Sequence, residues 1–266
     1  MNASNNGGVT VMAHLVAGYP TTEIAREAAR ALAEGGVSYF EVQFPFSDPS
    51  ADGKAIQSAC AQVLSRGYGI DDCFAFVAEL RKAYPAIPAF IMTYANLAYK
   101  PGVEKFVARA AAAGASGLIV PDLPFDSDEG LAASCLAHGI AAVPVAAPSM
   151  TAERVAAMVA LKRPFVYAAL RAGITGQETV IDDDTLGFIG SVSASGAKVL
   201  GGFGIRTGAQ SLALAPAVHA VVAGSVFVDA IREAAPSGAQ AVHAAVGRKA
   251  SELCGKKGTQ TAQNGV

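Results

Sequence analysis

The sequence predicts an α/β fold, a single (β/α)8 barrel of the TIM-barrel type. Short runs of β-branched and aromatic residues alternate along the chain with alanine-rich segments of helical periodicity. Strands that are each followed by a crossover indicate parallel pairing, and 266 residues is close to the usual length of such a barrel. A doubly wound open sheet is the alternative, but no glycine fingerprint follows the first apolar run.

Eight segments have the composition of strands. In chain order they are Val9–Gly18, Tyr39–Gln43, Pro88–Thr93, Gly117–Val120, Ile140–Val145, Phe165–Leu170, Lys198–Gly202 and Ala220–Gly224. Helical spacing marks the stretches between them, and several of these follow an N-capping residue or stop at glycine. The helical segments include Glu23–Glu34, Asp71–Ala83, Val103–Ala113, Ser127–His138, Ala152–Leu161 and Asp184–Ser195.

No boundary or long internal repeat interrupts this alternation, so we expect residues 1–254 to form one catalytic barrel domain. The remaining stretch, "GKKGTQTAQNGV" (residues 255–266), is polar and low in complexity. Such a composition cannot bury a core, and we expect a disordered tail.

Composition and charge exclude several classes of function. The chain is 52% hydrophobic and 16% charged, with a formal net charge of −2, so it has no electrostatic footprint for nucleic acid or an anionic membrane. It has no signal-peptide pattern and no apolar run long enough to span a bilayer, and a cytoplasmic location is expected. The cysteines, Cys60, Cys73, Cys135 and Cys254, are widely spaced without a CxxC motif, which favours buried free thiols over a metal site or disulfides.

The stretch "EVQFPFSDPSADG" places an acid near the end of a predicted strand. Alternate residues of a barrel strand face the interior, and the apolar set Phe40, Val42 and Phe44 belongs under the helices. This turns Glu41 and Gln43 inward. A buried carboxyl group is costly unless paired, and desolvation raises its pKa toward the range useful for proton transfer.

Glu41 is therefore a candidate catalytic residue, because barrel enzymes keep their catalytic groups at the C-terminal ends of the strands. The alternative is a glutamate neutralised by a hidden lysine, arginine or hydrogen-bond network. For Asp48 and Asp52, in the following loop, the Asp-Pro and Asp-Gly steps on their own favour roles in turns.

Glycine-rich turns follow the last three predicted strands, in "RAGITG", "GGFGI" and "AGSVF". Small residues let backbone N–H groups approach an anion, and a helix that begins at Ser225 would add its positive dipole end. Barrels commonly bind phosphate after strands seven and eight, so the turns indicate a phosphate site, with plain turns and helix caps as the alternative.

Six motifs carry a family resemblance. They are "EVQFPFSDPSADGKAIQ", "MTYANLAYKPGVEKF", "GLIVPDLP", "YAALRAGITG", "GGFGI" and "AGSVF". In order and spacing they resemble the tryptophan synthase α subunit family, from Val9 to about Ala234. The resemblance implies a barrel that cleaves indole-3-glycerol phosphate to indole and glyceraldehyde 3-phosphate, without a cofactor of its own. It also implies a pyridoxal-phosphate β subunit as partner, in an α2β2 complex, that receives the indole through a tunnel.

The same resemblance implies roles for individual residues. Glu41 matches the catalytic glutamate, which would make the proton transfers, and Asp52 the catalytic aspartate, ionised on its loop beside the indole nitrogen. The expected substrate-binding residues are Tyr94, Tyr167, Phe203, Thr175 and Arg171, although either tyrosine is nearly as well explained by ordinary packing. The expected phosphate contacts are Gly176, Gly204, Gly224 and Ser225. Asp122 would support the site from behind, and Asp48 would shape the loop or meet the β subunit.

The chain also departs from the family pattern. Gln43 stands where glycine is usual and could narrow the pocket or hydrogen-bond the catalytic acid. Lys54 replaces a proline, which predicts a less stiff and more basic loop, and Leu170 replaces a serine. The N-terminal helix that closes the barrel bottom is expected to be missing or reduced to "MNASNNGG".

Two alternatives therefore accompany the lyase. The first is a catalytically weak α-like subunit that activates the β subunit, and Gln43 and Lys54 motivate it. The second is another phosphate-binding barrel enzyme that processes a sugar or thiazole phosphate.

Overall fold

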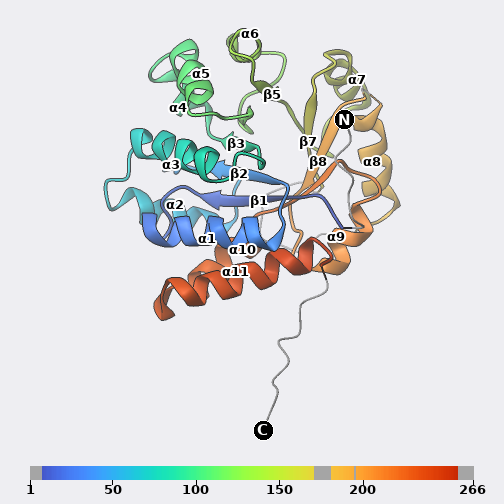
Figure 1. Ribbon diagram of the computed structural model, residues 1–266. Coiled ribbons are helices and arrows are strands. Elements are labelled where there is room, and N and C mark those ends of the chain that lie inside the picture. Colours follow the sequence, from blue (N-terminus) through green and yellow to red (C-terminus); the bar gives the residue numbers. More distant parts are fainter. Residues whose placement is uncertain (1–7, 171–180, 195, 257–266) are drawn as a thin grey trace.

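The computed structural model describes residues 8–170, 181–194 and 196–256 (Figure 1). Its strands form one parallel sheet with the order β5-β4-β3-β2-β1-β9-β8-β7-β6. They are β1 (Val11–Val16), β2 (Tyr39–Gln43), β3 (Ala89–Met92), β4 (Gly117–Ile119), β5 (Ala141–Val143), β6 (Val145–Ala146), β7 (Phe165–Ala169), β8 (Lys198–Gly202) and β9 (Ala220–Ala223). Each of the eight predicted strands is present, and the nine parallel strands form a nearly closed barrel.

One predicted strand, Ile140–Val145, is divided in two by Pro144. Proline has no N–H to donate to a neighbouring strand. Its carbonyl still accepts a hydrogen bond of 2.9 Å from the backbone N–H of Tyr167 in β7. Because β5 and β6 are the two ends of the sheet and are joined through this residue, the strand order returns to its start, as a barrel requires.

The helices lie around the outside of the sheet (Figure 1). They are α1 (Thr22–Gly35), α2 (Lys54–Leu64), α3 (Ile70–Ala83), α4 (Ala95–Tyr99), α5 (Val103–Ala112), α6 (Leu131–Ala137), α7 (Ala152–Ala160), α8 (Asp183–Ser193), α9 (Gly208–Leu214), α10 (Ser225–Ala234) and α11 (Ala239–Leu253), with a short 3₁₀ turn at Ala235–Ser237. The predicted helices are found within a residue or two of their expected ends, with one exception.

The exception is the helix predicted over Ser127–His138, which begins only at Leu131. Asp128 accepts hydrogen bonds from the backbone N–H groups of Gly130 and Ala132, at 3.0 and 2.9 Å. Gly130 has a left-handed φ of 84°, which ends any helical path through it. The aspartate therefore forms a turn where the periodicity alone suggested a first helical turn.

The alternation of β2 was predicted correctly. Phe40 and Val42 are fully buried in the apolar layer between strands and helices. Glu41 and Gln43 face the barrel interior, where a second apolar cluster contains Met12, Phe90, Ile119, Tyr167 and Leu200. Polar side chains are thus held among apolar ones inside the barrel.

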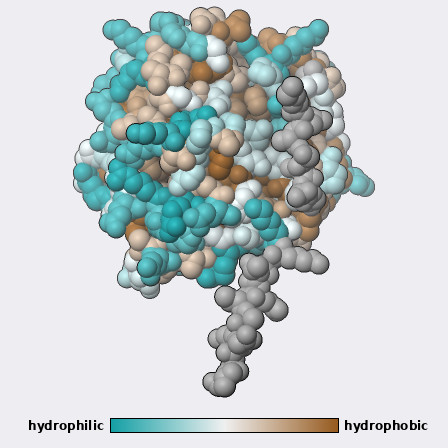
Figure 2. All heavy atoms as spheres, viewed as in Figure 1, coloured by the Kyte–Doolittle hydropathy of each residue, from teal (hydrophilic) through white to brown (hydrophobic). Residues whose placement is uncertain are grey.

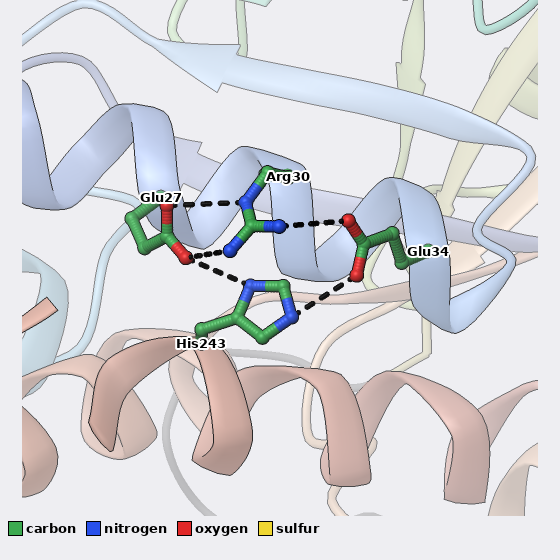
Figure 3. A network of polar contacts seen from close by, with 4 residues as sticks. All are labelled: Glu27, Arg30, Glu34 and His243. Carbon is green, nitrogen blue, oxygen red and sulfur yellow. Dashed lines mark hydrogen bonds and ion pairs between the residues drawn. The ribbon is translucent and has the colours of Figure 1, made fainter. Parts of the chain in front are cut away.

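Helices α1 and α11 pack side by side below β1 (Figure 1). At the edge of this contact His243 of α11 lies between two glutamates of α1, 3.0 Å from Glu27 and 3.0 Å from Glu34, and Arg30 bridges the same two carboxylates (Figure 3). Hydrophilic side chains cover most of the surface over α1, α3 and α11 (Figure 2). Such exposed ion pairs each contribute at most about 1 kcal/mol, so the apolar contact beneath them carries most of the stability.

The closeness of these two helices gives a testable prediction. A Cβ added at Gly35 of α1 would lie 2.4 Å from the Cβ of Ala250, whereas a Cβ added at Gly247 of α11 would meet nothing closer than 3.8 Å. We expect Gly35→Ala to lower the free energy of unfolding by about 1–3 kcal/mol through overpacking. Gly247→Ala, the matched control, should raise it by up to about 1 kcal/mol through helix propensity. Urea unfolding measures both, and equal effects would contradict this packing.

Candidate active site

A cavity that opens to solvent lies at the carboxyl ends of the barrel strands, and its volume with the open mouth included is about 550 Å³. Its polar lining includes His14, Glu41, Asp52, Tyr167 and Ser225. The other lining residues are Ile56, Met92, Ile119, Pro121, Val145, Phe203, Gly204, Ile205, Val222 and Gly224. The cavity thus combines a few converging polar groups with an apolar wall, as ligand sites usually do.

Glu41 is paired inside the barrel, and its partner is a histidine. In the register of β1 and β2, His14 lies directly opposite Glu41, and its Nδ1 is 2.6 Å from Glu41 Oε2. The two side chains are buried, with exposures of 3% and 4%. Burying a carboxyl group costs free energy unless it has a partner. For Glu41 this partner is an imidazole, and neither a lysine nor an arginine.

Burial of the His14 imidazole lowers its pKa, but the hydrogen bond and negative charge of Glu41, with the charge of Asp52, outweigh this effect. The pKa of His14 is therefore raised above its ordinary value. Its second nitrogen, Nε2, is buried and has no hydrogen-bond partner among the described residues. The sequence patterns did not identify His14 as a site residue. It lies on the inward face of β1, two residues after Met12, which faces the same way.

Asp52 is on the loop after β2, as predicted, but it is only 2% exposed. Its Oδ2 accepts hydrogen bonds of 2.7 Å from Gln43 Nε2 and 2.7 Å from the Tyr94 hydroxyl. The loop folds inward because the Tyr94 hydroxyl also accepts the N–H of Ala51, at 3.1 Å, and Gln57 donates to the Asp52 carbonyl, at 2.7 Å.

Asp52 is therefore a buried carboxyl group on this loop, held by two hydrogen bonds. Burial raises the pKa of Asp52, and the charge of His14 and the two hydrogen bonds counteract this only in part. Its neighbour Asp48 remains exposed on the same loop, and Lys54 is exposed at the first position of α2, where proline is also well suited.

Gln43 is fully buried and does not line the cavity, so of its two possible roles the narrowing of the pocket is not observed. Its amide nitrogen binds Asp52 rather than Glu41 and lies 3.5 Å from Cys60 Sγ. Gln43 thus holds the second acid of the site in place.

Two aromatic side chains border the cavity from the opposite side of the barrel. The rings of Tyr167 and Phe203 are 5.9 Å apart and nearly perpendicular, at 88°. Phe203 has a φ of 83°, a conformation that is strained for a residue with a side chain and is often found at functional sites. Burial, together with the charges of Glu41 and Asp52, raises the pKa of Tyr167, so its hydroxyl stays protonated.

Beside these rings, the backbone at Gly202 leaves no room for a side chain. A Cβ added at Gly202 would lie 2.3 Å from the Tyr167 hydroxyl and 2.9 Å from Val222 Cβ. Tyr94, the other tyrosine expected at the substrate, does not line the cavity. It stacks on Phe46, with ring centres 5.1 Å apart, and contacts Asp52 from behind.

Three of the four expected phosphate contacts, Gly204, Gly224 and Ser225, line one end of the cavity. Ser225 is the first residue of α10, and the N-terminus of this ten-residue helix has partial positive charge. The sequence patterns did not identify Arg206 as a neighbour of this site. Its Nη1 lies 3.4 Å from Ser225 Oγ and its Nη2 lies 3.0 Å from Asp229, so this end of the cavity is also next to a guanidinium group.

Asp122 is exposed and outside the cavity, where its carboxylate accepts the backbone N–H of Ala95 at 2.9 Å. It thereby fixes the backbone next to Tyr94. Leu170 is buried, and its N–H donates to the Gly202 carbonyl at 2.8 Å. Arg171, Thr175 and Gly176 lie outside the described residues.

The four cysteines are free and buried, as expected. Within residues 8–170, 181–194 and 196–256, no group of three or more histidine, cysteine, aspartate or glutamate side chains is arranged to hold a metal ion. Over the same residues, every helix is too short or too polar to cross a membrane.

A parallel barrel with carboxylates and a helix N-terminus at one cavity has the layout of barrel enzymes that bind small anionic substrates. The family model for "Tryptophan synthase alpha chain" matches residues 1–256, and the chain belongs to this family.

Relatives of that name support the assignment. The chain is 38% identical over 229 residues to the protein of Helicobacter hepaticus, covering 84% of this chain and 86% of that protein. It is 38% identical over 224 residues to that of Methanosarcina mazei, covering 84% and 81%.

Solved structures also support the family assignment. The structure of Mycobacterium tuberculosis tryptophan synthase has a TM-score of 0.81 and 33% identity, covering 93% of each chain. That of the tryptophan synthase complex from Pyrococcus furiosus has a TM-score of 0.81 and 30% identity, covering 92% of this chain and 98% of that one.

The burial of Asp52 predicts a pH-dependent stability. Because its pKa is raised in the folded protein, the folded state binds more protons than the unfolded state from the ordinary value of 3.8 upward to the raised pKa. Its contribution is therefore present at low pH and is lost as the pH rises through that window. Asp52→Asn keeps an oxygen for Gln43 and Tyr94 but removes the ionisation.

We expect Asp52→Asn to be more stable relative to the wild type at neutral pH than at a pH near 3.8. Urea unfolding of both proteins at the two pH values measures this difference. A difference that stays constant, or that grows at low pH, would contradict the buried environment of Asp52.

Proposed function

We propose that this chain is the lyase subunit of tryptophan synthase and cleaves indole-3-glycerol phosphate to indole and glyceraldehyde 3-phosphate. The observation that carries the proposal is the pair of buried acids, Glu41 and Asp52, in one cavity with an aromatic border and an anion-binding end. Family membership supports the same reaction. The chain itself would need no cofactor.

The reaction is a retro-aldol cleavage and needs three things from the protein. A proton must reach C3 of the indole, which makes the ring electron-poor. The hydroxyl group on the adjacent side-chain carbon must lose its proton, so that a carbonyl forms and the carbon–carbon bond breaks, returning its electron pair to the ring. The indole N–H must be stabilised while the ring carries positive charge. The proton gained at C3 and the proton lost from oxygen balance.

Glu41 is suited to the proton transfers because it lies inside the barrel at the cavity wall, where solvent does not compete for the proton. Asp52 is suited to the ring nitrogen, because Gln43 and Tyr94 fix its orientation through Oδ2 and its Oδ1 would accept the N–H. Preorganised groups of this kind stabilise charge that develops in the transition state. Tyr167 and Phe203 would then border the indole ring.

The phosphate would bind where Gly204, Gly224 and Ser225 meet, at the N-terminus of α10. Arg206 lies 3.4 Å from Ser225 Oγ, with its guanidinium also paired to Asp229 at 3.0 Å. The opposite ends of the substrate are thereby held by different parts of the barrel, which orients C3 toward Glu41.

We further propose that the chain works in the cytoplasm with a β subunit in an α2β2 assembly, and that pyridoxal phosphate belongs to that partner. The structure from Pyrococcus furiosus is of a tryptophan synthase complex, which supports a partner of this kind. Exposed Asp48, on the loop that holds Asp52, is a candidate contact with it.

The role of Glu41 is tested by indole release from indole-3-glycerol phosphate, with and without the cognate β subunit. Glu41→Gln should lower the rate by about 10²–10⁴-fold, because it removes the group that transfers the proton. Asp48→Asn, on the exposed part of the next loop, is the control and should retain the rate of the isolated chain. Retention of activity in Glu41→Gln would exclude this role.

The phosphate end gives an independent test. Ser225→Asp places a carboxylate at the N-terminus of α10, a position where negative charge normally stabilises a helix. The same charge would repel a bound phosphate, so we expect KM to rise about tenfold or more. Because Ser225 is buried, urea unfolding of the variant is measured beside KM. A KM close to that of the wild type would place the phosphate elsewhere.

A further inference from the structure

His14 lies between the two ends of the candidate site. Its strand, β1, pairs with β2 on one side and with β9 on the other. On the β2 side its Nδ1 is 2.6 Å from Glu41 Oε2. On the β9 side, Ala13 pairs with Ala223, and a Cβ built on Gly224 would lie 3.6 Å from His14 Cβ. The imidazole therefore bridges the acid and the phosphate-binding turn.

Among the described residues, the groups that face His14 are acidic or neutral. Glu41 approaches from β2, the charge of Asp52 acts on it from the loop before α2, and Tyr167 of β7 lines the same cavity with a protonated hydroxyl. Two carboxyl groups beside one imidazole favour its charged form, in which both ring nitrogens carry a proton. The contact with Glu41 is then a charge-assisted hydrogen bond, consistent with its short distance.

The second nitrogen is the informative feature. Nε2 is buried in a side chain that lines the cavity and has no hydrogen-bond partner among the described residues. Leaving a buried donor unpaired is costly, so such groups are usually satisfied by another partner, such as a bound ligand. A ligand in this cavity is the natural partner.

We propose that His14 positions Glu41 through Nδ1–H and donates Nε2–H to an oxygen of the substrate's glycerol phosphate arm. This inference rests on the proposed function. If C3 of the indole lies at Glu41 and the phosphate at Ser225, the oxygen-bearing carbons that join them must pass His14. His14 is thus both a positioning residue for the acid and a contact for the polar part of the substrate.

Three variants separate these two roles. His14→Asn retains an N–H donor near Nδ1 but has none near Nε2, so KM should rise about tenfold or more while kcat changes less. His14→Gln places its donor near Nε2 instead, so kcat should fall and KM should change less. His14→Phe retains a ring without nitrogen, and both parameters should worsen.

The pH profile distinguishes these roles from simple packing. In the wild type, loss of the imidazolium proton removes one of the two hydrogen bonds, so kcat/KM should fall on the alkaline side. His14→Asn does not titrate and should lack this limb. His219→Phe is the control: its imidazole is bonded to the Tyr39 hydroxyl at 2.8 Å, at the amino ends of the strands, and its loss should leave the profile unchanged. Urea unfolding of each variant is measured as well, to establish that it is folded.

A measurement without catalysis keeps the inference separate from the proposed function. The ring nitrogens of His14 are followed by NMR while sn-glycerol 3-phosphate is added to the wild type and to His14→Asn. We expect the Nε2 resonance to shift and the affinity to fall about tenfold in His14→Asn.

If the wild type cleaves indole-3-glycerol phosphate but the His14 variants retain its kinetics and pH profile, the inference is wrong and the function stands. If the wild type does not cleave it, the proposed function fails, and the titration alone decides. A shifted Nε2 and a weakened variant would then still support His14 as the contact, whereas an unchanged resonance would overturn it.

Discussion

The burial of two carboxyl groups inside an apolar barrel is the constraint on which the rest of the site depends. Because β2 alternates, the same pattern that packs Phe40 and Val42 under the helices turns Glu41 and Gln43 into the interior. An acid in that position is tolerated only with a partner. His14, Gln43 and Tyr94 are placed as they are because the two acids, Glu41 and Asp52, need donors.

The strand order of the barrel brings these buried acids close to the other residues of the site. β1 lies between β2 and β9, so the acid and the N-terminus of α10 are separated by a single strand. β7 and β8 add Tyr167 and the turn with Phe203 from farther round the ring. The acids, the aromatic border and the N-terminus of α10 therefore meet in one cavity, although the sequence spreads these residues from His14 to Ser225.

Much of this arrangement could be predicted from the sequence, because it follows from local patterns. The strands, the inward direction of Glu41 and the glycine turns after β8 and β9 depend on composition and alternation within a few residues. The partner of Glu41 could not be predicted from such local patterns. His14 is 27 residues away and contacts Glu41 only because of the register between β1 and β2. The burial of Asp52 was missed for the same reason: its loop is drawn inward by Tyr94, a residue of the next strand's end. Asp128, whose turn delays α6, shows that side-chain bonds also override periodicity.

In the proposed reaction Glu41 and Asp52 act on different atoms of one indole ring, while the N-terminus of α10 binds the phosphate. The most direct measurement is the crystal structure of the Glu41→Gln variant with indole-3-glycerol phosphate bound. We expect C3 of the indole beside residue 41, the ring nitrogen within hydrogen-bond distance of Asp52, and the phosphate at Gly224 and Ser225. A substrate bound with its ring nitrogen away from Asp52, or with its phosphate at another part of the barrel, would contradict these roles.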